Sequence, residues 1–151
     1  MNYFLFGGAR DTGKSKSVYN IANFLINTRG YKVRSGSFPA KYSEFWCIIV
    51  KDDKVILIQS YTDLVKTIKD LKKVRDSNKD ITHIITANRN EGDHMRSRFR
   101  KILNITTNDY VFEIPLGKVI SGKTRSANIV WYLDGVLRIA KEITNNTPFN
   151  F

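Results

Sequence analysis

Short apolar runs, rich in β-branched and aromatic residues, recur along the chain and predict six β-strands. Each run is four to eight residues long and is bounded by glycine, proline or polar residues. That length and those boundaries are typical of strands buried in a sheet. The predicted strands cover residues 3–6, 31–38, 45–50, 55–60, 81–87 and 110–114.

Four other segments place apolar residues three or four positions apart, which is the spacing of one face of an α-helix. In the first of them Val18, Ile21 and Leu25 share a face, and Gly30 suits the end of that helix. In the second, Thr62 is a suitable N-terminal cap. The predicted helices cover residues 14–28, 62–75, 93–103 and 126–143.

Strands that alternate with helices predict a three-layer α/β domain with a mostly parallel sheet. Residues 45–50 and 55–60 flank four polar residues and therefore predict one antiparallel hairpin. With 151 residues, the chain fits a single domain, predicted at residues 1–144. We expect residues 145–151 to form a loose C-terminal tail, because they show no periodic pattern.

The composition is that of a folded protein, with 42% hydrophobic and 26% charged residues. No apolar run approaches the length of a membrane span, so we expect a soluble cytoplasmic protein without a membrane partner. The single Cys47 lies in an apolar run and predicts a buried, inert thiol. The formal net charge of +11 favours polyanionic partners such as nucleotides, nucleic acid or an acidic protein.

The segment between the first strand and the first helix carries a phosphate-binding pattern. It fits G-x-x-x-x-G-K-[ST] at every position, followed by Lys16. Glycines allow such a loop to wrap closely around phosphates with its backbone N–H groups, and the following helix adds its positive N-terminal end. The residues expected to hold the phosphates are Gly8, Ala9, Arg10, Asp11, Thr12, Gly13, Lys14, Ser15 and Lys16.

This strand, loop and helix resemble the P-loop NTPase superfamily, over residues 2–28. The resemblance implies a P-loop sandwich fold, a nucleoside triphosphate ligand and a Mg²⁺ ion. In it, Lys14 would reach the β- and γ-phosphates and Ser15 would offer its hydroxyl to Mg²⁺. The loop before the last helix, at residues 117–125, would border the base. Residues 55–63 and 84–89 also resemble small prokaryotic or phage P-loop proteins.

The resemblance also implies an acidic Mg²⁺ ligand directly after a second buried strand. Here residues 55–58 are followed by Gln59, and the nearest acid is Asp63. Asp63 is therefore the candidate metal ligand together with Ser15, although it equally suits the first turn of a helix as a dipole-complementing acid. Asp52 and Asp53 follow another strand, but their position predicts a turn.

Two motifs bear on the choice of base. GTPases of the Ras and translation-factor type carry Asp-x-x-Gly after the hairpin and Asn-Lys-x-Asp after a later strand. In this chain, residues 59–62 occupy the position of Asp-x-x-Gly. Asn88, Arg89, Asn90 and Glu91 occupy the position of Asn-Lys-x-Asp. Only Asn88 matches, so ATP is favoured over GTP.

Arginines after the fifth strand are candidates for stabilising phosphoryl transfer, which requires cations around the moving phosphoryl group. Arg89 follows that strand, and Arg96, Arg98 and Arg100 lie in the predicted helix behind it. We take Arg89 and Arg96, with Lys14 and Asp63, as candidate catalytic residues. A solvated helix face and a nucleic-acid contact are the alternatives for the helix.

Three functions remain open at this point. The preferred one is a small NTPase or nucleotide-dependent switch that hydrolyses ATP and acts with a partner or as an oligomer. The second is a kinase for a nucleoside, nucleotide or similar small acceptor, although residues 38–45 leave little length for an acceptor pocket. The third is a nucleic-acid-associated factor whose nucleotide site is regulatory.

Overall fold

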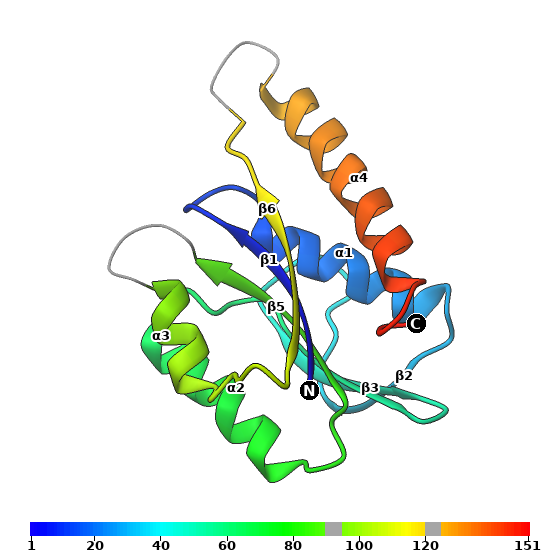
Figure 1. The fold of residues 1–151 in the computed structure, drawn as a ribbon. Coiled ribbons are helices and arrows are strands. Elements are labelled where there is room, and N and C mark those ends of the chain that lie inside the picture. The colour runs from blue at the N-terminus through cyan, green and yellow to red at the C-terminus, as the bar shows by residue number, and fades with distance from the viewer. Residues whose placement is uncertain (90–94, 120–124) are drawn as a thin grey trace.

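The computed structural model describes residues 1–89, 95–119 and 125–151. It is an α/β structure built on one mixed sheet of six strands, in the order β2-β3-β4-β5-β1-β6 (Figure 1). The strands are β1 (Asn2–Gly8), β2 (Lys32–Gly36), β3 (Trp46–Lys51), β4 (Lys54–Gln59), β5 (His83–Arg89) and β6 (Tyr110–Leu116). The six strands predicted from the sequence are thus confirmed, with ends shifted by a few residues.

Strands β4, β5, β1 and β6 run parallel, and β3 pairs antiparallel with both β2 and β4. The predicted hairpin is the β3–β4 pair, whose turn holds Asp52 at a left-handed φ of 51°. In the register of the sheet, Gly8 lies opposite Arg89 on one side and Leu116 on the other. The carboxyl ends of the parallel strands therefore meet at one edge, where ligands bind in open α/β sheets.

Helices cover both faces of the sheet, so the predicted three layers are present. Figure 1 shows α1 (Lys14–Asn27) and α4 (Arg125–Thr144) on one side and α2 (Val65–Ser77) and α3 (Met95–Ile102) on the other. Alternate residues of β1 serve the two cores: Phe4 and Phe6 face α1 and α4, whereas Tyr3 and Leu5 face α2 and α3. This alternation follows from the two-residue period of a strand.

The lone cysteine behaves as its sequence context predicted. Cys47 is fully buried in β3, and burial raises the pKa of its thiol to about 12. Because the thiolate is the reactive form, this side chain is an inert part of the core. Among the described helices, none has the length and apolar character needed to cross a membrane.

The C-terminal segment differs from the loose tail expected from the sequence. Phe149 and Phe151 are buried, and their rings pack around His83 with centroid separations of 6.1 and 5.0 Å. The His83 ring also lies within hydrogen-bonding distance of Asn2 and of the Pro148 carbonyl, at 3.1 and 3.3 Å. These two side chains lie in a segment without helical or strand periodicity, so no sequence pattern indicated their burial. Phe149 also packs against Phe4 of β1, and Phe151 against Tyr31.

The buried histidine makes stability depend on pH. Burial lowers the pKa of His83 below its ordinary value of 6.5. The unfolded chain therefore binds more protons than the folded chain below about pH 6.5, and the free energy of unfolding falls as the pH drops, by at most about 1.4 kcal/mol per pH unit. Urea unfolding of the parent and of His83→Gln at several pH values should show the parent losing more stability on acidification. Equal losses in both proteins would contradict this assignment.

Candidate phosphate-binding site

The predicted phosphate loop connects the end of β1 to the start of α1. Asp11 and Gly13 adopt left-handed φ values of 62° and 88°, which coil the loop tightly ahead of the helix. The Thr12 hydroxyl and the Lys14 ammonium both donate to the Ala9 carbonyl, at 3.0 and 2.7 Å. These two hydrogen bonds close the loop on itself, and left-handed residues in such a turn are typical of anion-binding backbone.

Lys14 is a buried cation in this loop, with 4% of its side chain exposed. A buried charge requires a counter-charge and hydrogen-bond partners. Its Nζ atom has the Ala9 carbonyl at 2.7 Å and the Asp63 Oδ1 atom at 3.8 Å. The lysine is therefore held within the loop, facing a carboxylate from the segment between β4 and α2.

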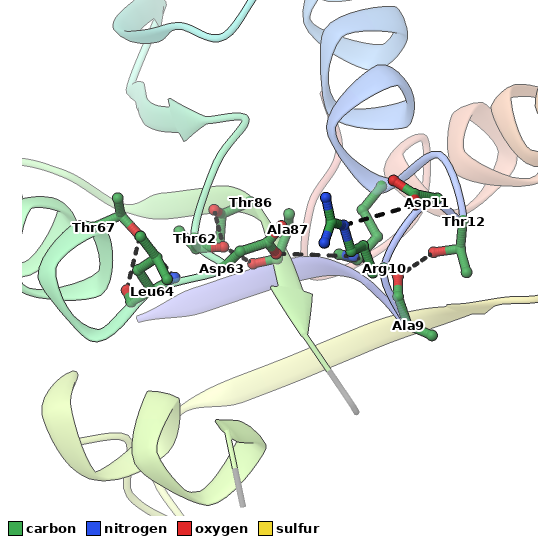
Figure 2. Close-up of polar contacts among 11 residues, drawn as sticks. Ala9, Arg10, Asp11, Thr12, Thr62, Asp63, Leu64, Thr67, Thr86 and Ala87 are labelled. Carbon is green, nitrogen blue, oxygen red and sulfur yellow. Dashed lines mark hydrogen bonds and ion pairs between the residues drawn. The ribbon is translucent and has the colours of Figure 1, made fainter. Parts of the chain in front are cut away.

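Asp63 is brought there by the segment that follows β4. The buried Gln59 side chain donates to the carbonyls of Tyr61 and Thr67, at 2.7 and 2.9 Å, and so fixes the path of this segment. The Thr62 hydroxyl donates to the Ala87 carbonyl of β5. Figure 2 shows Thr62 and Asp63 beside the loop that carries residues 9–12.

The side-chain oxygens of Ser15 and Asp63 fit a Mg²⁺ site in which bound phosphates supply further ligands. Asp63 Oδ1 is inaccessible to solvent and accepts no hydrogen bond, and Ser15 lines the same pocket. No group of three acidic, histidine or cysteine side chains lies together in the described residues. Mg²⁺ usually binds through one or two protein oxygens, water and substrate phosphates, so Ser15 and Asp63 suffice chemically.

Three other residues at or near the ends of strands, Gln59, Asp52 and Asp53, do not supply a metal ligand to this site. Gln59 occupies the position directly after β4, and its amide is used by the two backbone carbonyls described above. Asp52 and Asp53 lie in the β3–β4 turn, at the end of β4 opposite to the one that leads to Asp63. Of the acids proposed from the sequence as metal ligands, Asp63 is therefore the one that the fold brings to the loop.

A pocket of about 580 Å³ opens above the loop and has two unlike walls. The polar wall is residues 10–16 of the loop with Tyr42, Glu44 and Asp63, and the opposite wall comes mainly from α4. The residues of this second wall are Val119, Ile129, Val130, Tyr132 and Leu133. Sequence reasoning missed both Glu44 and the α4 wall, because nothing local to these residues marks their proximity to the loop. Residues 120–124 of the expected base-bordering loop lie outside the described residues.

Tyr42 joins the site through the segment between β2 and β3. Its ring packs edge-on against Tyr19 of α1, with centroids 5.7 Å apart, and the Lys16 ammonium lies 4.9 Å from its centroid. Burial raises the pKa of the Tyr42 hydroxyl, and a hydrogen bond with Ser15 partly offsets that effect. Tyr42 thus contacts Ser15, one of the two candidate metal ligands.

The arginines predicted to act in catalysis lie outside the lining of this pocket. Arg96 forms an ion pair with Glu113 of β6 at 2.6 Å, and Asn88 donates to the other Glu113 oxygen at 3.4 Å. Arg89 ends β5 beside Gly8, and its Nε atom is buried without a hydrogen bond. Asn90 and Glu91 of the guanine-like motif lie outside the described residues. Glu113 was not foreseen, because a single acid in a strand is no signal by itself.

No protein-family model matches the chain, and neither a curated protein nor a solved structure matches it. The evidence for the site is therefore its own geometry.

A side chain at Gly13 should lower the free energy of unfolding. A Cβ there would lie 2.7 Å from Leu133 Cδ2, and the φ of 88° costs an alanine about 1 kcal/mol. Gly30 is a matched control, since its φ is 80° but no atom lies within 4 Å of an added Cβ. We expect Gly30→Ala to cost about 1 kcal/mol of unfolding free energy, and Gly13→Ala about 1 kcal/mol more, because the end of the Leu133 side chain must shift. Urea unfolding of both variants measures the difference, and equal costs would show that the Leu133 side chain moves aside without loss of packing.

Proposed function

We propose that the chain binds a Mg²⁺–nucleoside triphosphate at the phosphate loop and acts as a small NTPase or nucleotide-dependent switch, with ATP as the favoured nucleotide. The observation that carries this proposal is the buried Lys14, held by Ala9 and facing Asp63 at 3.8 Å beside a pocket of ligand size. A buried lysine in a closed glycine loop at a helix N-terminus is suited to a polyphosphate.

The polar wall supplies what a triphosphate requires. Lys14 would meet the β- and γ-phosphates, in place of part of its present interaction with Asp63. The N-terminus of α1 adds a partial positive charge. Arg10 and Lys16 line the same wall and supply further positive charge. Ser15 and Asp63 would hold a Mg²⁺ ion, which would supply positive charge against the phosphates.

The apolar wall is suited to the base and sugar. Val119, Ile129 and Val130 present aliphatic side chains opposite the loop. Such a surface favours a purine by contact area. Asn88, the residue that matches the guanine-reading motif, faces Glu113 instead of this pocket. That arrangement favours ATP over GTP.

Water is the favoured phosphoryl acceptor. In hydrolysis it attacks the γ-phosphorus, the bond to the β–γ bridging oxygen breaks, and the products are a nucleoside diphosphate and orthophosphate.

A kinase would need room for an acceptor beside the loop. The segment before β3 fills that region, because Phe38, Tyr42 and Phe45 all pack on Tyr19. With Gln59 in place of an acid after β4, we expect turnover to be slow in the isolated chain.

The central test is Lys14→Ala. Removing the buried ammonium should weaken binding of Mg²⁺–ATP by at least about tenfold, as expected for loss of a charge-assisted contact. Calorimetric titration with ATP and GTP, each with and without Mg²⁺, measures the dissociation constants and identifies the preferred base. Lys32→Ala removes an exposed lysine of β2 and serves as the control. Unchanged affinity in a folded Lys14→Ala protein would reject the proposal.

A second test addresses the metal. Asp63→Asn keeps the shape of the side chain but removes the carboxylate that faces both Lys14 and the proposed Mg²⁺. We expect it to bind ATP in EDTA more tightly than the parent does, because a competing anion is lost, and to gain less affinity from Mg²⁺. The ratio of the dissociation constants in EDTA and in Mg²⁺ should therefore fall by several-fold. An unaltered ratio would mean that Asp63 is not a metal ligand.

A further inference from the structure

The positive charge of the chain is concentrated on one side of the sheet. Helices α2 and α3 together carry nine basic and two acidic residues, a net of +7 out of +11 for the chain. Helices α1 and α4, on the other side, carry five basic and two acidic residues, a net of +3. The sequence gives the total charge, but only the packing of α2 against α3 makes it a single surface (Figure 1).

Six of these basic side chains are exposed and form no ion pair with any residue in the described part of the chain. They are Lys66, Lys69 and Lys73 of α2 and Arg98, Arg100 and Lys101 of α3, and we call this set the basic face. Ile68 and Phe99 are buried against the sheet, so the helical period turns Lys66, Lys73 and Lys101 directly outward. By contrast, Lys72 and Arg75 are neutralised by Asp76.

We propose that the basic face binds the phosphate backbone of a nucleic acid. Its size fits this partner: Lys66 and Lys73 are separated by seven residues of helix, roughly 10 Å, which is about three nucleotide steps along a strand. Unpaired lysines and arginines release counterions from a polyanion on contact, which is the main source of sequence-independent affinity.

An acidic protein is the less suitable occupant. The centre of a protein–protein interface is depleted in lysine and requires buried aromatic or aliphatic groups. The large exposed apolar side chains of the described residues lie on other elements, and Leu64, just before α2, is the one nearest to this face. A surface of basic side chains alone is typical of contact with a phosphate backbone.

The test compares two variants of equal net charge. The face variant is Lys69→Gln, Lys73→Gln and Lys101→Gln. The control variant is Lys32→Gln, Lys51→Gln and Arg138→Gln, which removes three exposed charges from other elements. Fluorescence anisotropy with a labelled DNA duplex of about 20 base pairs, and with an RNA strand of similar length, measures affinity between about 50 and 200 mM salt without nucleotide.

We expect the parent to bind at low salt with a steep salt dependence. The face variant should bind at least about tenfold more weakly, with a log–log salt slope smaller by about two to three, and the control variant should stay within about twofold of the parent. Equal weakening in both variants, or no binding by the parent at about 50 mM salt, would overturn the proposal. Displacement of the duplex by poly-glutamate at equal charge concentration would overturn it in favour of an acidic polypeptide.

The outcome is independent of the proposed nucleotide function. None of the six substituted residues lines the phosphate-binding pocket. Titration of both variants with Mg²⁺–ATP therefore reports the loop alone, and nucleic-acid binding that persists in Lys14→Ala would support the basic face even if nucleotide binding failed.

Discussion

The arrangement of the site depends on one buried charge, the ammonium of Lys14. A cation in a protein interior must be compensated, and here a backbone carbonyl and a carboxylate do so. The carbonyl belongs to Ala9 and closes the loop, and the carboxylate belongs to Asp63 and links the loop to the segment after β4. A polyphosphate, which we propose as the ligand, carries more negative charge than one carboxylate and would compensate the Lys14 ammonium better.

The geometry that delivers Asp63 follows from hydrogen bonding at the ends of parallel strands. β4, β5 and β1 end at one edge, and the polar side chains beyond them satisfy one another's backbone groups. Gln59 and Thr62 are buried there and donate to backbone carbonyls of neighbouring segments, those of Tyr61, Thr67 and Ala87. The glutamine that looks like a missing metal ligand in the sequence is thus a structural residue that positions the acid further along.

The two faces of the sheet differ in the features that they carry. The α1 and α4 side carries the phosphate loop, the aliphatic wall and the larger aromatic core, including the C-terminal Phe149 and Phe151. The α2 and α3 side carries a smaller core and the basic face. A link between the two is the segment from Asp63 to the start of α2 at Val65, which joins the candidate phosphate site directly to the basic helices.

The sequence alone determined the elements and the loop, because strand and helix periodicity, and the glycine and lysine spacing of residues 8–15, are local properties. It placed Asp63 among the candidates but could not establish its distance from Lys14, and it missed Glu44, Glu113 and the α4 wall. It also assigned Phe149 and Phe151 to a loose tail. These features were decided by tertiary structure, because contacts between residues far apart in the chain depend on strand order and packing, which no local pattern records.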